Sequence, residues 1–182
     1  MIFSLAACAF PLQATEGGAS YPEIEGKVFL SEEAALKLVF PGCDRVDKIS
    51  HVINKEEKAG IEARLGWALS QSSVTVYHGF AKGLGQGRAV IAEEIGKFKP
   101  ITFIVKVSEN GTVERVDVMV YREAVGEEVR RGRFTRQFRG KSVKDPLRIN
   151  RDILNVTGAT MSVQAMTAGV KKVLAILEEI HE

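Results

Sequence analysis

The sequence has few of the residues that build metal and disulfide redox centres. Among its 182 residues it has 2 cysteines and 3 histidines, and no Cys-x-x-Cys pair occurs. It therefore gives no support to a zinc ribbon, a thioredoxin-type dithiol or a c-type haem. The histidines His51, His78 and His181 lack the spacing of metal ligands, so we expect them to be structural or surface residues.

Excess charge of one sign is also lacking. The formal net charge is +2, which is too small to favour nucleic acid as a partner. One stretch, from Val129 to Lys144, nevertheless contains basic residues and no acid. Its basic residues are Arg130, Arg131, Arg133, Arg136, Arg139, Lys141 and Lys144. The run is either a solvated helical face or an anion site that could also receive an acidic partner, and both interpretations stay open.

Long apolar runs are confined to the N-terminus. Residues 2–12 are almost wholly apolar but too few to span a bilayer, and they fit the hydrophobic part of a signal peptide without its basic start. The four residues ending at Cys8 resemble a lipoprotein lipobox; the alternative is a chance apolar start. We expect a leader and tether over residues 1–26 and one domain over residues 27–182. The location expected is extracytoplasmic, in the periplasm or attached to the membrane through Cys8.

Hydrophobic patterning predicts an α+β domain. Helices are expected over residues 31–40, 55–65, 127–138 and 162–180, and strands over residues 74–80, 88–95, 101–107 and 113–121. Asn110-Gly111 between two β-type runs indicates a hairpin. This order predicts a single antiparallel sheet flanked by helices. We read Trp67 as a core anchor. Residues 83–87 are glycine-rich but precede a strand, so they are expected to be a hairpin connection rather than a nucleotide loop.

The most informative segment directly precedes the last amphipathic helix. Gly158 would let the backbone approach a ligand closely, and Ala159 keeps the space small. Thr160 and Ser162 place hydroxyls at a helix start, where N–H groups and the dipole favour a phosphate. Helix capping explains the same hydroxyls equally simply.

Thr157-Gly158-Ala159-Thr160 resembles the [ST]-G-A-[TS] motif of the FMN-binding domain family. That family includes the covalent-FMN subunits of sodium-pumping NADH:quinone oxidoreductase and of Rnf-type electron-transport complexes. The likeness extends over about residues 67–177. Its further pieces are Gly96-Lys97, residues 100–103, Tyr121-Arg122-Glu123, Gly126, Phe134, Gln137-Phe138, Gly140-Lys141, residues 145–147 and Asp152-Ile153.

The resemblance implies that a flavin transferase moves FMN from FAD onto Thr160 and forms a phosphoester. Glu123 matches an acidic position near the family's flavin, where it could bind the cofactor or pair with an arginine. Phe134 and Phe138, four residues apart, could form an apolar wall for the ring or belong to the core. Lys141 and Arg139 are candidate neighbours of the phosphate.

One position departs from the family pattern. The family has Asp three residues before the first Ser or Thr of the motif, whereas this chain has Leu154. In an extended segment Asp152 would point to the same side and could replace it in part. Leu154 itself could instead bury apolar area.

The sequence shows no nucleophile–base arrangement and no signature of a substrate pocket. The resemblance therefore implies an electron-transfer protein rather than an enzyme with its own substrate. Its partners would be redox proteins, including a membrane electron-transport complex. Two alternatives remain: a flavin-bearing sensor or accessory module of such a complex, and a degenerate domain that has lost its flavin.

Overall fold

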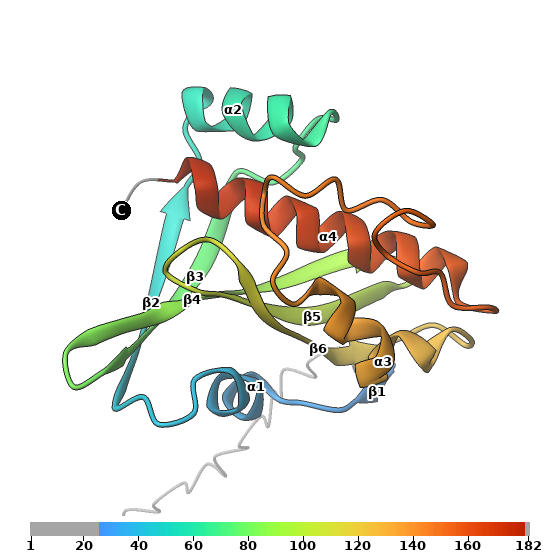
Figure 1. Cartoon of the computed structure of the whole chain (residues 1–182), viewed down its shortest axis with the longest axis horizontal. Coiled ribbons are helices and arrows are strands. Elements are labelled where there is room, and N and C mark those ends of the chain that lie inside the picture. The colour runs from blue at the N-terminus through green and yellow to red at the C-terminus, as the bar shows by residue number, and fades with distance from the viewer. Residues whose placement is uncertain (1–25, 181–182) are drawn as a thin grey trace, which may run out of the picture.

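The computed structural model describes residues 26–180, which form one antiparallel sheet with helices on both faces (Figure 1). The sheet has six strands in the order β1-β6-β5-β4-β3-β2. The strands are β1 (Lys27–Val28), β2 (Arg45–Val52), β3 (Ser73–Ala81), β4 (Leu84–Ile95), β5 (Pro100–Val107) and β6 (Val113–Tyr121). The α+β class, the single antiparallel sheet and the strands β3 to β6 are as predicted.

Hydrophobic patterning did not predict two of the strands, β1 and β2. β2 is mostly exposed along its length, because it is the edge strand paired only with β3. Its residues therefore lack the apolar alternation of a half-buried strand. β1 is two residues long and pairs Lys27 and Val28 with the end of β6. The glycine-rich residues 83–87 lie in and beside the β3–β4 hairpin, as predicted.

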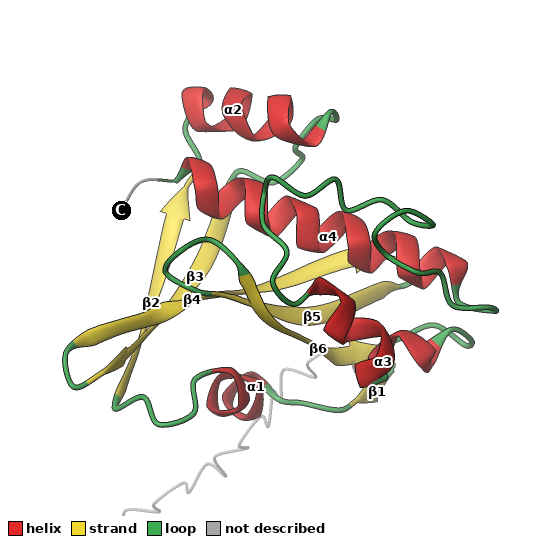
Figure 2. Ribbon diagram, in the orientation of Figure 1, coloured by secondary structure: helices red, strands yellow, loops and turns green. Residues whose placement is uncertain are grey.

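The helices divide between the two faces of the sheet (Figure 2). α2 (Lys55–Leu65) and α4 (Thr160–Glu179) lie on one side, and α1 (Glu32–Val39) lies on the other. The larger core cluster joins α4 and α2 to the sheet, while α1 packs on a smaller cluster that includes Tyr77 and Ile104. Gly169 lets α4 approach the sheet, since a Cβ there would overlap the ring of Phe103.

Side-chain caps fix the starts of the first two helices. Ser31 accepts a hydrogen bond from Ala34 N at 3.2 Å, as expected of the predicted cap. Asn54 and Glu57 form a reciprocal capping box at the start of α2, and Gly66, with φ 80°, ends that helix. Both helices therefore lie close to their predicted bounds.

The predicted helix over residues 127–138 is wrong in its continuity. The structure has three short turns instead: η1 (Glu127–Arg130), α3 (Gly132–Thr135) and η2 (Arg136–Phe138). Arg131 is extended, with ψ 137°, and separates η1 from α3. Gly132 directly after it is a poor helix former, so no long helix continues through this point.

Two further expectations are corrected. α4 begins at Thr160 rather than Ser162. Trp67 is 43% exposed and is not a core anchor; its ring lies 5.1 Å from the ammonium of Lys171 on α4. Within residues 26–180, no helix combines the length and the apolar character needed to cross a membrane. The same residues contain no cluster of potential metal ligands. Cys8 and His181 lie outside the described residues.

Candidate functional site

The Thr160 hydroxyl lies at the exposed start of α4. Ala159 occupies the cap position, and no side chain caps this helix start. Before it, the chain makes a turn in which Ala159 N donates to Val156 O at 3.0 Å and Gly158 takes a positive φ of 82°. A residue with a Cβ is disfavoured in that left-handed conformation. The turn therefore explains the glycine of the motif and presents Thr160 on the surface.

Asn155 fixes the position of the Thr160 side chain. Its Nδ2 donates a hydrogen bond to Thr160 Oγ1 at 3.2 Å. The hydroxyl proton of Thr160 is not used in this contact, because Oγ1 is the acceptor. The oxygen is thus oriented while its own proton stays available for transfer.

A cavity of about 340 Å³ lies beside this turn. Its volume is in the range of ligand pockets, at the small end. Part of its lining is apolar and part carries hydrogen-bonding groups and charge. The lining residues are Glu128, Arg131, Arg133, Phe134, Gln137, Leu154, Asn155, Val156 and Thr157. Because Asn155 both lines this cavity and binds Thr160, the cavity and the hydroxyl belong to one site, which we call the Thr160 site.

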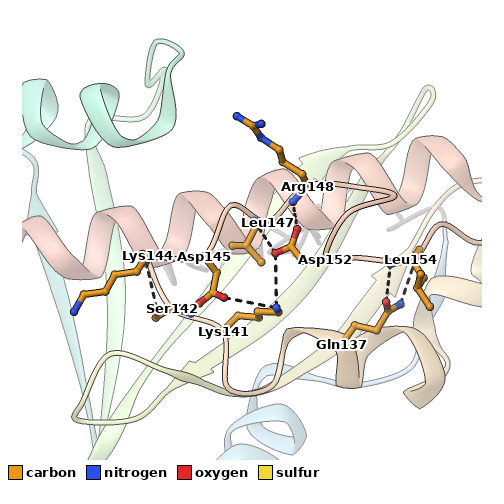
Figure 3. Close-up of polar contacts among 9 residues, drawn as sticks. All are labelled: Gln137, Lys141, Ser142, Lys144, Asp145, Leu147, Arg148, Asp152 and Leu154. Atoms are coloured by element: carbon orange, nitrogen blue, oxygen red, sulfur yellow. Dashed lines mark hydrogen bonds and ion pairs between the residues drawn. The ribbon is translucent and has the colours of Figure 1, made fainter.

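Gln137 holds the backbone of Leu154, a residue of the Thr160 site that lies three positions before the motif. Leu154 N donates to Gln137 Oε1 at 2.7 Å, and Gln137 Nε2 donates to Leu154 O at 3.3 Å (Figure 3). One amide side chain thus satisfies both backbone groups of a residue in irregular structure. The contact joins η2 to the motif segment across 17 positions of sequence.

The structure corrects two expectations about the departure at Leu154. Its side chain is 68% exposed, so it does not contribute the buried apolar area expected of it. Asp152 lies in a turn, not in an extended segment, and its carboxylate accepts from Leu147 N at 3.0 Å and Arg148 N at 2.6 Å (Figure 3). Asp152 is therefore committed to its own loop rather than to the place of the missing acid.

The two candidate phosphate neighbours lie elsewhere. Lys141 has its ammonium 3.6 Å from Asp145 Oδ1 and 3.7 Å from Asp152 Oδ2, so it is part of the loop that those acids organise (Figure 3). Arg139 lines a different cavity, on the other side of η2. The cations that line the Thr160 site are Arg131 and Arg133.

Ser162 is buried, at 3% exposure, and its hydroxyl lies 2.8 Å from Tyr121 Oη. Tyr121 in turn donates to Val125 O at 2.5 Å. Burial raises the pKa of the Tyr121 phenol, so it stays a neutral donor. The Ser162 hydroxyl thus ties the start of α4 to the segment after β6 and points away from the exposed Thr160.

Glu123 organises the turn between β4 and β5. Its Oε1 accepts from Phe98 N at 2.6 Å and Lys99 N at 3.0 Å. Partial burial opposes ionisation of Glu123, but the hydrogen bonds from Lys99, Phe98 and Lys97 together lower its pKa. Glu123 is not among the residues that line the Thr160 site.

Phe134 and Phe138 form a buried aromatic pair. Their ring centroids are 5.4 Å apart at an interplanar angle of 89°, and their exposures are 1% and 0%. Both therefore belong to the core, and Phe134 also forms part of the cavity wall. The two interpretations offered by the sequence are combined in Phe134, whereas Phe138 has only the core role.

Sequence patterns indicated no functional role for Asn155, Gln137 or Val156, and Arg131 and Arg133 were noted only as part of a basic run. All five line the Thr160 site. A signal for Asn155 was available, since it lies directly between the departing position and the motif. The role of Gln137 depends on a contact between distant segments, which composition and spacing do not reveal.

The comparisons with known proteins agree with this geometry. The FMN-binding domain family matches residues 96–175, a span that contains the whole Thr160 site. Among solved structures, NqrC of Shewanella oneidensis has a similar fold, with a TM-score of 0.52 and 15% sequence identity. The alignment covers 75% of this chain and 84% of that chain. No protein with a curated description matches the chain.

Proposed function

We propose that this chain carries FMN covalently on Thr160 and transfers electrons. The proposal starts from the match of residues 96–175 to the FMN-binding domain family and from the similarity in fold to NqrC. The observation that carries the proposal is the placement of the Thr160 hydroxyl. It is exposed at an uncapped helix start, oriented by Asn155, and next to a cavity of about 340 Å³.

The attachment reaction is a phosphoryl transfer from FAD, carried out by a flavin transferase. Thr160 Oγ1 forms the new bond to the phosphorus of the FMN half, and the diphosphate bond of FAD breaks. AMP leaves, and the Thr160 hydroxyl proton passes to a base of the transferase. Asn155 supports this step because its N–H orients Oγ1 without consuming that proton.

The residues of the Thr160 site fit the cofactor by their chemistry. Phe134 and Val156 offer apolar surface for a flat ring, and Gln137 and Thr157 offer hydrogen-bonding groups. FMN, when bound, supplies the capacity to exchange one or two electrons. Arg131 and Arg133 would stabilise the negative charge of the phosphate and the charge that reduction adds.

We also propose that the chain acts outside the cytoplasm with a redox partner, such as a membrane electron-transport complex. The apolar N-terminal run and the lipobox-like residues before Cys8 support this location. Exposed Leu154 and Met161 flank the motif and offer apolar contact area to a partner close to the cofactor. Fractionation of cells that express the native gene tests the location: full-length, uncleaved protein in the cytoplasm would contradict it.

Covalent attachment is tested by expression with a flavin transferase, followed by denaturation and in-gel flavin fluorescence. The wild type should retain fluorescence, and Thr160→Val should lose it completely because no hydroxyl remains. Ser162→Ala is the matched control, since it removes a nearby buried hydroxyl that does not line the Thr160 site, and it should retain the flavin. Fluorescence that persists in Thr160→Val would refute attachment at this residue.

A second candidate function is a binding domain without covalent flavin. The observation that favours it is Leu154, which stands where the family motif has an acid. The same gel distinguishes the two functions, provided that a known acceptor domain is loaded in the same cells. Wild-type protein that stays unlabelled beside a labelled acceptor supports the second function.

A further inference from the structure

A larger cavity of about 500 Å³ lies on the other side of the segment that forms α3 and η2. Its walls come from the end of α1, from β5 and β6, and from α3 and η2. In Figure 1, α1 lies under the sheet and α3 lies close to β6. None of its lining residues is shared with the Thr160 site.

The charges that line this cavity do not balance. Lys106 Nζ lies 2.6 Å from Glu114 Oε2, and Arg115 Nε lies 2.5 Å from Asp117 Oδ2, so each carboxylate of the lining already has a cation. Arg136 and Arg139 also line the cavity. The structure of residues 26–180 gives neither guanidinium a carboxylate partner. Two arginines therefore remain for an anion from outside.

A guanidinium is suited to carboxylate and phosphate groups because its planar N–H groups can form two parallel hydrogen bonds. The end of α1 and the turn after it give the same cavity an apolar surface, formed by Leu38, Val39 and Pro41. An occupant that uses both surfaces has an anionic group and an apolar body.

The segment 131–139 is the common wall of the two cavities. Arg131, Arg133 and Gln137 line the Thr160 site, while Arg136 and Arg139 line the larger cavity. The segment consists of short turns rather than one long helix. Gln137 lies between Arg136 and Arg139 in the sequence and is hydrogen-bonded to the backbone of Leu154. A ligand that moves either arginine therefore also acts on this contact.

We propose that the larger cavity is a second ligand site, which binds a small phosphate or carboxylate with an apolar body through Arg136 and Arg139. Binding at this second site is transmitted through residues 131–139 to the Thr160 site. The binding itself does not depend on FMN. The transmission rests on the proposed function, because its readout is the attached flavin.

Titration calorimetry on the unloaded full chain tests binding with three probes: phenyl phosphate, inorganic phosphate and phenol. Phenyl phosphate should bind most tightly, because it alone presents both an anion and an apolar body. Loss of one charge-assisted contact corresponds to roughly a tenfold loss of affinity, so Arg136→Gln and Arg139→Gln should each weaken phenyl phosphate by about that factor.

Arg151→Gln is the matched control, since it removes an exposed guanidinium that lines neither of the two cavities. It should leave the affinity for phenyl phosphate unchanged. Weakening by Arg133→Gln, which alters the lining of the Thr160 site, without weakening by Arg136→Gln or Arg139→Gln would move the anion to the Thr160 site and overturn the proposal. Failure of phenyl phosphate to bind, or equal binding of phenol, would overturn it as well.

Transmission is tested on the flavin-loaded protein by adding phenyl phosphate and recording flavin fluorescence. The intensity should change in the wild type, with a concentration dependence that matches calorimetry, and should not change in Arg136→Gln/Arg139→Gln. A change that persists in this double variant would contradict transmission from the second site. A chain that binds phenyl phosphate but carries no flavin would refute the proposed function while leaving the second site in place.

Discussion

The connection between η2 and α4 contains two consecutive stretches that are built in opposite ways. In residues 140–153, the carboxylates of Asp145 and Asp152 are bound to backbone N–H groups of the same stretch. Residues 154–160 contain no acid, and both Leu154 and Thr160 are exposed. Acidic side chains of the first stretch bind its own backbone, whereas the backbone of the second is bound at Leu154 by Gln137 of η2 (Figure 3).

This difference separates a scaffold from the segment that carries the motif. The first stretch keeps Leu147 in the left-handed region, at φ 46°, a conformation that a non-glycine residue adopts only when its surroundings fix it. The motif stretch depends instead on the Gln137 side chain, which binds its backbone at Leu154, and on Asn155. The side chain of Leu154 is used in none of these contacts, so the departure from the family motif leaves the local structure intact.

The largest effect on stability should come from the scaffold. Asp152→Ala removes the acceptor for Leu147 N and Arg148 N and one of the two acids beside Lys141. We expect the free energy of unfolding to fall by about 1–3 kcal/mol, the usual cost of leaving such groups unsatisfied. Urea denaturation measures it. The rate of flavin loading per folded molecule should stay within a factor of two of the wild-type rate, and a larger loss would break the distinction between the stretches.

The reverse pattern is expected at Gln137. Gln137→Ala removes two hydrogen bonds to the Leu154 backbone at a partly exposed site, which should cost about 0.5–1.5 kcal/mol of stability. The rate of flavin loading should fall severalfold, because the motif loses its external clamp. Gln137→Glu keeps the acceptor for Leu154 N but not the donor to Leu154 O. In a timed transferase assay its rate of flavin loading should lie between those of the wild type and Gln137→Ala.

Acid should weaken the scaffold. A hydrogen bond from the backbone N–H of Ser142 lowers the pKa of Asp145 below its ordinary 3.8. Partial burial opposes this shift, and the Ser142 hydroxyl and Lys141 add to it. A lowered folded-state pKa means that the stabilisation is complete above the unfolded value and disappears as pH falls through the folded value. Asp145→Asn should therefore have a flatter stability profile below pH 3.8 than the wild type. Parallel profiles in thermal unfolding would argue against this role.

The smallest effect on stability is expected at Leu154. Since the side chain is 68% exposed, Leu154→Asp should change the free energy of unfolding by no more than about 0.5 kcal/mol. The loading rate should rise, because a carboxylate near the acceptor can bind the metal ion that accompanies the flavin phosphate. Leu154→Asn is the uncharged control. A clear fall in melting temperature would mean that Leu154 packs more tightly than the structure shows.

The sequence predicted the fold where local patterns decide it. The hairpin at Asn110-Gly111 and the apolar stripe of α4 are local features, and both lead to correct elements. β2 was missed because an exposed edge strand has no apolar alternation. The break at Arg131 was missed because a continuous basic run resembles one helical face.

The candidate site divides in the same way. The motif from Thr157 to Thr160 is contiguous, so the turn at Gly158 and the hydroxyl of Thr160 at the helix start could be predicted from the sequence. Gln137 acquires its role only through a contact with Leu154, which is 17 positions away. Ser162 is buried through a contact with Tyr121, which lies 41 positions earlier. Such pairings are set by tertiary packing, and spacing alone does not reveal them.

Attachment of one FMN to Thr160 can be located by peptide mapping of protein that was co-expressed with a flavin transferase. Cleavage after Arg151 and Lys171 releases residues 152–171, which contain Thr157, Thr160 and Ser162 together. This peptide should carry the mass of FMN less one water, with fragment ions that place it on Thr160. An unmodified peptide from cells that load a known acceptor, or flavin on Thr157 or Ser162, would contradict the claim.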